Sequence, residues 1–223
     1  MKQSIQVGLF LALLVLPVVG RQPMQVDAAA ALESALLATD AEQAALRPFI
    51  GGYPPRFDAS MSPEVATDRL KRLIADLSKL ADTSPNNAEI EWRLGDAYRL
   101  GHNLDLEGAW QASEAALKRA MAHDPKCFQA YIVLGGLYVD SSPKLAGEAE
   151  RLFKKAIELA GDRPAPLAYR GLAFAYLMQR DGEKALKAAD ECVKRFPDLD
   201  DMRRLRDHLR KNPRVEIKEA PGP

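Results

Sequence analysis

The feature that most constrains the fold is a pattern that occurs three times between residues 88 and 197. Each copy begins with a leucine, a small residue and a tyrosine, at Leu94-Gly95-x-x-Tyr98, Leu134-Gly135-x-x-Tyr138 and Leu172-Ala173-x-x-Tyr176. A small residue recurs later in each copy at steps of 36 and 36 residues, at Ala120, Ala156 and Cys192. This period predicts stacked, similar units rather than a single continuous core.

Each unit is expected to be a pair of helices. Alanine and leucine are frequent and β-branched residues are sparse, which favours helix over strand. A glycine inside a helix costs about 1 kcal/mol against alanine, so its recurrence at Gly95 and Gly135 indicates a steric use. We therefore expect the paired helices to approach closely at these positions. Prolines stand where a helix has to stop, at Pro85 before the first unit, at Pro125 after it and at Pro197 after the third.

These motifs resemble the tetratricopeptide repeat (TPR), whose signature is W-x-x-L-G-x-x-Y…A…F…A…P over about 34 residues. The copy at 166–197 fits without a gap, whereas the first two copies carry 6 and 2 extra residues between their helices. Trp92 stands one place later than the usual aromatic position. The resemblance implies an all-α solenoid of about three helix pairs, at residues 88–125, 128–163 and 166–197.

Flanking segments are expected to extend this array, which we place at residues 62–211. Ser62-Pro63 is a typical helix start, and an apolar stripe follows as far as Ala81. Residues 198–211 have a narrow apolar stripe on a charged helix, as a terminal cap requires. Within 21–61 we expect one or two Ala-rich helices, the second opened by a capping box at Thr39-x-x-Glu42, and then a Pro/Gly/aromatic loop at 48–57. Residues 212–223 are expected to form a flexible tail.

The N-terminus predicts export. Lys2 precedes an apolar run from Val7 to Val19 that ends at Gly20, which is typical of a secretory signal peptide spanning residues 1–20. A spanning helix needs roughly 20 apolar residues, so an uncleaved anchor is the less favoured alternative. We expect a periplasmic or secreted protein that contacts the membrane only if this segment is retained.

Composition argues against several function classes. Lys+Arg and Asp+Glu are equal at 31 each, so no excess positive charge favours nucleic acid. No phosphate-binding loop, nucleophile elbow or H-E-x-x-H pair is present. His102 lies near Asp105 in an inserted turn, which is too few ligands for a metal site. We predict no enzymatic activity, no cofactor and no metal, and we expect Cys127 and Cys192 to be buried and unpaired.

The resemblance also implies a binding surface. In TPR arrays the first helix of each pair lines a concave groove, and the ligand-contacting positions of the family map here onto ten candidate residues: Trp92, Asp96, Arg99, Ile132, Val139, Asp140, Arg170, Phe174, Leu177 and Met178. The Lys and Asn of the family's carboxylate clamp are absent from the corresponding positions. The predicted groove is apolar with scattered charges, as suits a peptide or helix.

Two functions remain open from the sequence. The first is an exported adaptor or scaffold that binds a protein or peptide partner through the concave groove. The second is a structural subunit of a cell-envelope assembly, whose groove is filled by its own N-terminal segment or by another copy. For Trp92 in particular, packing against the helix at 63–81 is as reasonable as contact with a partner.

Overall fold

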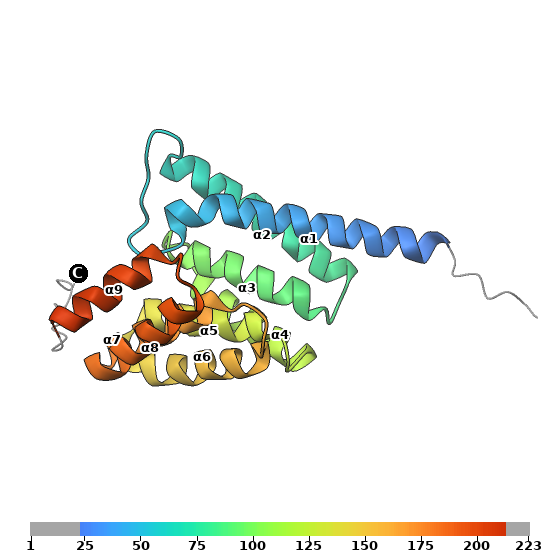
Figure 1. Ribbon diagram of the computed structural model, residues 1–223. Coiled ribbons are helices and arrows are strands. Elements are labelled where there is room, and N and C mark those ends of the chain that lie inside the picture. Colours follow the sequence, from blue (N-terminus) through green and yellow to red (C-terminus); the bar gives the residue numbers. More distant parts are fainter. Residues whose placement is uncertain (1–22, 213–223) are drawn as a thin grey trace, which may run out of the picture.

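The computed structural model describes residues 23–212, which form helices and no β-strand. Figure 1 shows them in chain order. The α-helices are α1 Pro23–Ile50, α2 Pro63–Thr83, α3 Ala88–His102, α4 Ala109–His123, α5 Phe128–Ser141, α6 Ala146–Ala160, α7 Pro166–Met178, α8 Gly182–Arg195 and α9 Asp200–Lys211. A 3₁₀ turn, η1 Pro143–Leu145, precedes α6. The predicted signal peptide at 1–20 and nearly all of the predicted tail lie outside these residues.

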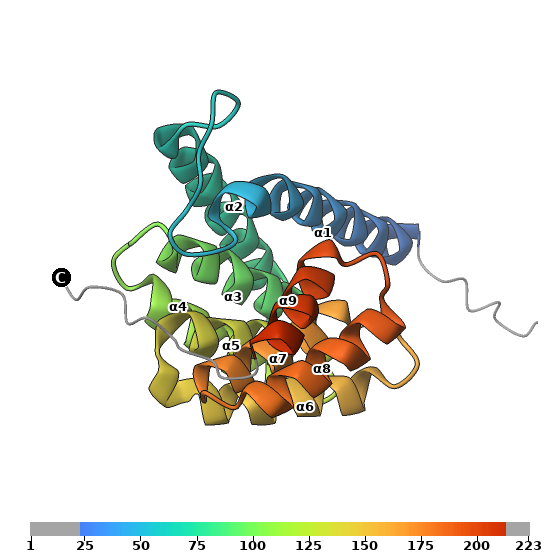
Figure 2. The ribbon, with the colours of Figure 1, turned by 60° about the vertical axis from the view of Figure 1, so that its left-hand side comes forward.

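Consecutive helices pack as antiparallel pairs that stack side by side (Figures 1 and 2). The pairs α3/α4, α5/α6 and α7/α8 correspond to the three sequence repeats, and the first helices α3, α5 and α7 contact one another in turn. The prediction of an all-α solenoid is therefore confirmed. A further pair, α1/α2, packs ahead of the first repeat, with both helices contacting α3.

Local sequence sets the helix ends. Ser62 caps α2 by accepting a hydrogen bond from the Val65 amide at 3.3 Å, with Pro63 in the first turn. Asn87 caps α3 and Asp181 caps α8 in the same way. Gly161 follows α6 with a φ of 58°, a left-handed conformation that glycine adopts without strain. The extra residues of the first two repeats fall at the ends of α3 and α5 and in the connections that follow these helices.

Two glycines, Gly135 of the recurring pattern and Gly171 outside it, make room for one aromatic ring. Phe153 of α6 is 2% exposed and lies between α5 and α7. A Cβ atom built on Gly135 would lie 2.9 Å from the ring, and one built on Gly171 would lie 2.2 Å from it. Neither position can carry a side chain unless the ring moves. Phe153 thus joins the second repeat to the third through two glycines, of which the sequence pattern revealed only Gly135.

The N-terminal region differs from its prediction in two ways. Residues 23–50 form a single helix, and Thr39 does not open a second one, because its hydroxyl donates 2.8 Å to the Leu36 carbonyl within the helix. The helix also continues through Pro48, so the predicted loop begins at Gly51 rather than at 48. Pro48 lies in the last turn of α1, where the Gly51 amide still donates 2.9 Å to the Arg47 carbonyl, and Ile50 is fully buried.

The C-terminal helix α9 covers the last repeat, as expected of a cap. Met202 and Leu209 are 0% and 2% exposed and join the core formed by α7 and α8. Leu205 is half-buried against the same core, and the remaining side chains of α9 are mostly charged and exposed. This pattern buries the apolar face that the final helix pair would otherwise present to water.

The contact between Phe153 and the two glycines gives a direct test of the packing. We expect Gly171→Ala to lower the free energy of unfolding by about 1–3 kcal/mol, because the new methyl group overlaps the ring. Gly147→Ala in α6 is the matched control, since no atom lies within 4 Å of its Cβ position. That control should be neutral or stabilise the helix by up to about 1 kcal/mol. Urea unfolding measures both, and equal effects would contradict the packing role of Gly171.

Candidate partner-binding surface

The ten candidate residues lie on α3, α5 and α7, the first helices of the three repeats. We call the surface formed by these residues the inner face. The structure divides them into a charged group on α3 and the end of α5, and an apolar group on α5 and α7. Trp92 lies apart from both groups.

The charged group is held by the N-terminal helix. Asp96 of α3 is fully buried, and its two carboxylate oxygens accept from Arg47 of α1 at 2.7 Å and from Arg99 at 3.1 Å. Arg99 is itself buried and also contacts the Asp140 carboxylate of α5 at 3.2 Å. A single network of charges therefore connects α1, α3 and α5. Asp96 is not accessible to a partner in this arrangement.

The charges in this network favour the ionised form of Asp96. Burial alone would raise the pKa of the carboxyl group, but the positive charges of Arg99 and Arg47 outweigh burial and hold the pKa of Asp96 below its usual value. The carboxylate is thus charged at neutral pH although no part of it reaches solvent. A buried charge of this kind is stable only while its partners stay in place.

Further contacts fix the second half of α1 along α3. Asp40 accepts two hydrogen bonds from Arg93, at 2.7 and 2.8 Å, and Gln43 donates 2.8 Å to the Arg93 carbonyl. At the end of α1, Asn103 is 1% exposed and donates 2.9 Å to the Ile50 carbonyl. Polar side chains of α1 thus bind Arg93 and Asp96 of α3. Of these two residues, Asp96 is one that the repeat pattern assigned to a partner.

Trp92 is half-buried and packs beside the core of α4 and α5, so its contact is with the repeats rather than with α2. Its indole N–H donates 3.0 Å to Glu89, and the Arg93 guanidinium lies 4.4 Å from the ring centroid. Both partners are on α3 itself. The indole is therefore oriented by its own helix.

The apolar group is brought together on α5 and α7. Val139 is buried, and Ile132, Phe174 and Met178 are half-buried around it in one cluster, whereas Leu177 faces the core of α7 and α8. Arg170 is exposed, lies 5.6 Å from the Phe174 ring and contacts Asp201 of α9 at 3.0 Å. Beside it, Leu167 is 46% exposed. This part of the inner face remains accessible.

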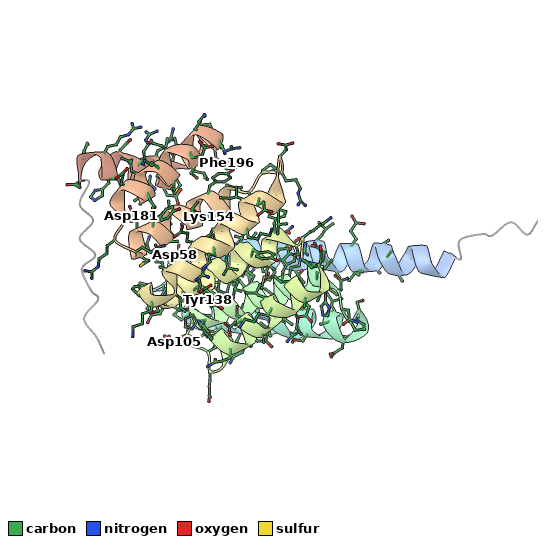
Figure 3. All side chains as sticks on the ribbon, turned by 90° about the horizontal axis from the view of Figure 1, so that it is seen from below. Asp58, Asp105, Tyr138, Lys154, Asp181 and Phe196 are labelled. Carbon is green, nitrogen blue, oxygen red and sulfur yellow. The ribbon has the colours of Figure 1, made fainter. Side chains whose placement is uncertain are left out.

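Ionisable and metal-ligating side chains are dispersed over residues 23–212. In that range no group of three His, Cys, Asp or Glu side chains could hold a metal ion. Asp105 lies in the connection between α3 and α4, with its side chain exposed (Figure 3). Burial raises the pKa of the Cys127 and Cys192 thiols to about 11, so neither is a thiolate at neutral pH. None of the helices described here is both long and apolar enough to cross a membrane.

Comparison with known proteins agrees with this architecture. No family model and no curated protein matches the chain. A search of solved structures finds the crystal structure of a thermophilic TPR protein from Thermus thermophilus, with a TM-score of 0.55 and 19% sequence identity. The match covers 83% of this chain and 94% of the other. This chain has a TPR fold.

The TPR fold fixes the arrangement of the helices, but the fold alone names neither an activity nor a partner. In this TPR array, α1 occupies the inner face over α3 and leaves it accessible over α5 and α7. Occupation of the groove by the N-terminal segment was one of the two alternatives left open by the sequence, but Arg47, Asp40 and Gln43 could not be named as the contacts because they lie outside the repeats.

The buried charge network generates a prediction about Asp96. Replacing Asp96 with Asn should cost about 3–5 kcal/mol at pH 7, because the buried Arg99 loses the charge that compensates its burial and the pair with Arg47 is also lost. Asp190→Asn is the control, since Asp190 pairs with Arg210 at the surface, where such pairs contribute roughly 0–1 kcal/mol. Urea unfolding of both variants checks the contrast.

The same variant has a pH signature. Because the folded-state pKa of Asp96 is lowered, its stabilising effect is present above its unfolded-state pKa of about 4 and is lost as the pH falls through the folded-state value. The stability difference between wild type and Asp96→Asn should therefore be constant from neutral pH to about pH 5 and shrink below about pH 4. A difference that does not change with acidification would contradict a buried ionised Asp96.

Proposed function

We propose that this chain is an exported TPR adaptor that binds a protein or peptide partner through the inner face of α5 and α7. The observation that carries the proposal is the accessible cluster of Ile132, Phe174 and Met178, with Arg170 and Leu167 beside it. Half-buried apolar side chains with an adjacent cation are typical anchors for a short peptide or helix. The TPR fold supports this role in general terms.

The chemistry of the surface suggests the kind of partner. Phe174 and Met178 offer apolar contact, and Leu167 extends this contact toward the start of α7. Arg170 pairs with Asp201 at the surface, so an acidic group of a partner could replace Asp201 at little cost. We therefore favour a partner segment that presents apolar side chains together with a carboxylate.

Export is a separate part of the proposal and rests on the sequence. A basic start, an apolar run of 13 residues from Val7 to Val19 and a small residue at Gly20 support cleavage after Gly20. N-terminal sequencing of the protein recovered from cells tests it. A new N-terminus at Arg21 is expected, whereas an intact Met1 or Lys2 would favour a retained anchor.

A second role is favoured by the contacts of α1. Arg47, Asp40 and Gln43 hold α1 against α3, so the N-terminal segment occupies part of the inner face. This observation supports the alternative of a structural subunit of a cell-envelope assembly, in which the inner face serves contacts within the chain or between copies. The two roles differ in what contacts the face of α7.

Photo-crosslinking in intact cells distinguishes the two roles. A photoreactive residue at Leu167 lies on the exposed edge of the face and removes no core contact. The adaptor role predicts one dominant foreign protein among the adducts, identified by mass spectrometry. Adducts only to residues 21–61, or to a second copy of this chain, would favour the structural subunit instead.

A charge reversal on the same face tests whether the crosslinked adduct depends on Arg170. Arg170→Glu should reduce the adduct at least about tenfold, because it repels an acidic partner group, while stability changes by no more than about 1 kcal/mol. A photoreactive residue at the exposed Lys187 of α8 is the matched control and should give no such adduct. An adduct that is unaffected by Arg170→Glu would remove Arg170 from the site.

A further inference from the structure

The two ends of the array differ in how they are covered. At the C-terminal end, α9 buries Met202 and Leu209 against the last helix pair. At the N-terminal end, an open cleft of about 770 Å³ lies between α1 and α2. Every residue that lines the cleft belongs to α1 or α2, so no other described helix closes it. Arrays of this kind need both terminal faces covered or polar.

The cleft has an apolar floor and a charged rim. Ala35, Ala38 and Leu80 line it together with the buried Leu73. Its inner end is closed where Arg69 of α2 donates two hydrogen bonds of 2.7 Å to Glu42 of α1. Exposed large apolar side chains are also concentrated at this end, since three of the four in the described chain lie on α1, α2 or their connection: Leu37, Tyr53 and Val65.

The rim charges form a pattern that complements itself. Arg72, Asp76 and Lys79 are exposed along one side of α2, one helical turn apart. The Arg72 side chain donates only to the backbone carbonyl of Asp68, which leaves its charge available. If two α2 helices cross in antiparallel fashion about a two-fold axis, Arg72 of each copy meets Asp76 of the other. The same surface thus provides both the cation and the anion of each pair, as an isologous interface, in which both copies use the same surface, requires.

We propose that the N-terminal end of the array docks a second copy of this chain, cleft against cleft. The contact buries Ala35, Ala38 and Leu80 of both copies and forms two reciprocal Arg72–Asp76 pairs. In this dimer the α1/α2 pairs of the two copies cap each other. The interface uses the outer end of the array and leaves the α5 and α7 face accessible, so it is independent of the proposed adaptor function.

The test is a charge exchange in the protein purified from its own cells, with association followed by sedimentation velocity. The wild type is expected to dimerise. Asp76→Arg and Arg72→Asp should each weaken self-association at least about tenfold, because every rim pair becomes repulsive. Mixing the two variants should restore a dimer, because both pairs between unlike copies are again attractive. Glu183→Arg on the exposed side of α8 is the control and should dimerise like the wild type.

Two results would overturn the proposal. A wild type that sediments as a monomer at every concentration shows that another occupant, such as residues 1–22, covers the cleft or that it stays open. A dimer that persists in both single variants, with no recovery specific to the mixture, places the interface elsewhere. Neither result affects the crosslinking at Leu167, which reports on the face of α7.

Discussion

The buried carboxylate of Asp96 is the interaction on which the arrangement of this molecule depends. A carboxylate without solvent contact is unfavourable by several kcal/mol unless cations compensate it, and here the cations come from Arg99 on the same helix and Arg47 on α1. Arg99 also pairs with the Asp140 carboxylate, which connects α3 to α5. Release of α1 would expose the Asp96 carboxylate to water or leave it without the Arg47 charge. The helix α1 is therefore an integral part of the array.

A second constraint is steric and acts between the later repeats. Phe153 fills the space that Gly135 and Gly171 leave, so α5, α6 and α7 are positioned by one ring. The charge network therefore fixes the N-terminal half of the molecule, and close packing fixes the C-terminal half. The apolar cluster around Phe174 lies on α5 and α7, the helices that the second constraint positions.

The two constraints differ in how far apart their residues lie in the sequence, and this separation decides what the sequence could predict. The three helix pairs follow from local spacing, because each small residue must face the neighbouring helix of its own unit. Asp96 and Arg99 occupy positions that contact ligands in related arrays, but their burial depends on Arg47, which is 49 residues from Asp96. No repeat pattern contains that contact. Likewise, Thr39 has the spacing of a capping box, yet its hydroxyl donates to the Leu36 carbonyl and the helix is continuous across it.

We expect the second half of α1 to unfold together with the repeats, because Arg47, Asp40 and Gln43 hold it to α3. Native-state hydrogen exchange measures this directly, because it gives an opening free energy for each backbone amide. The amides of Gln43 and Leu46 are expected to exchange with the same opening free energy as those of Leu94 and Leu134, which report on α3 and α5. If instead the amides of α1 open at a much lower free energy while those of α3 stay protected, α1 is a detachable segment and the account is wrong.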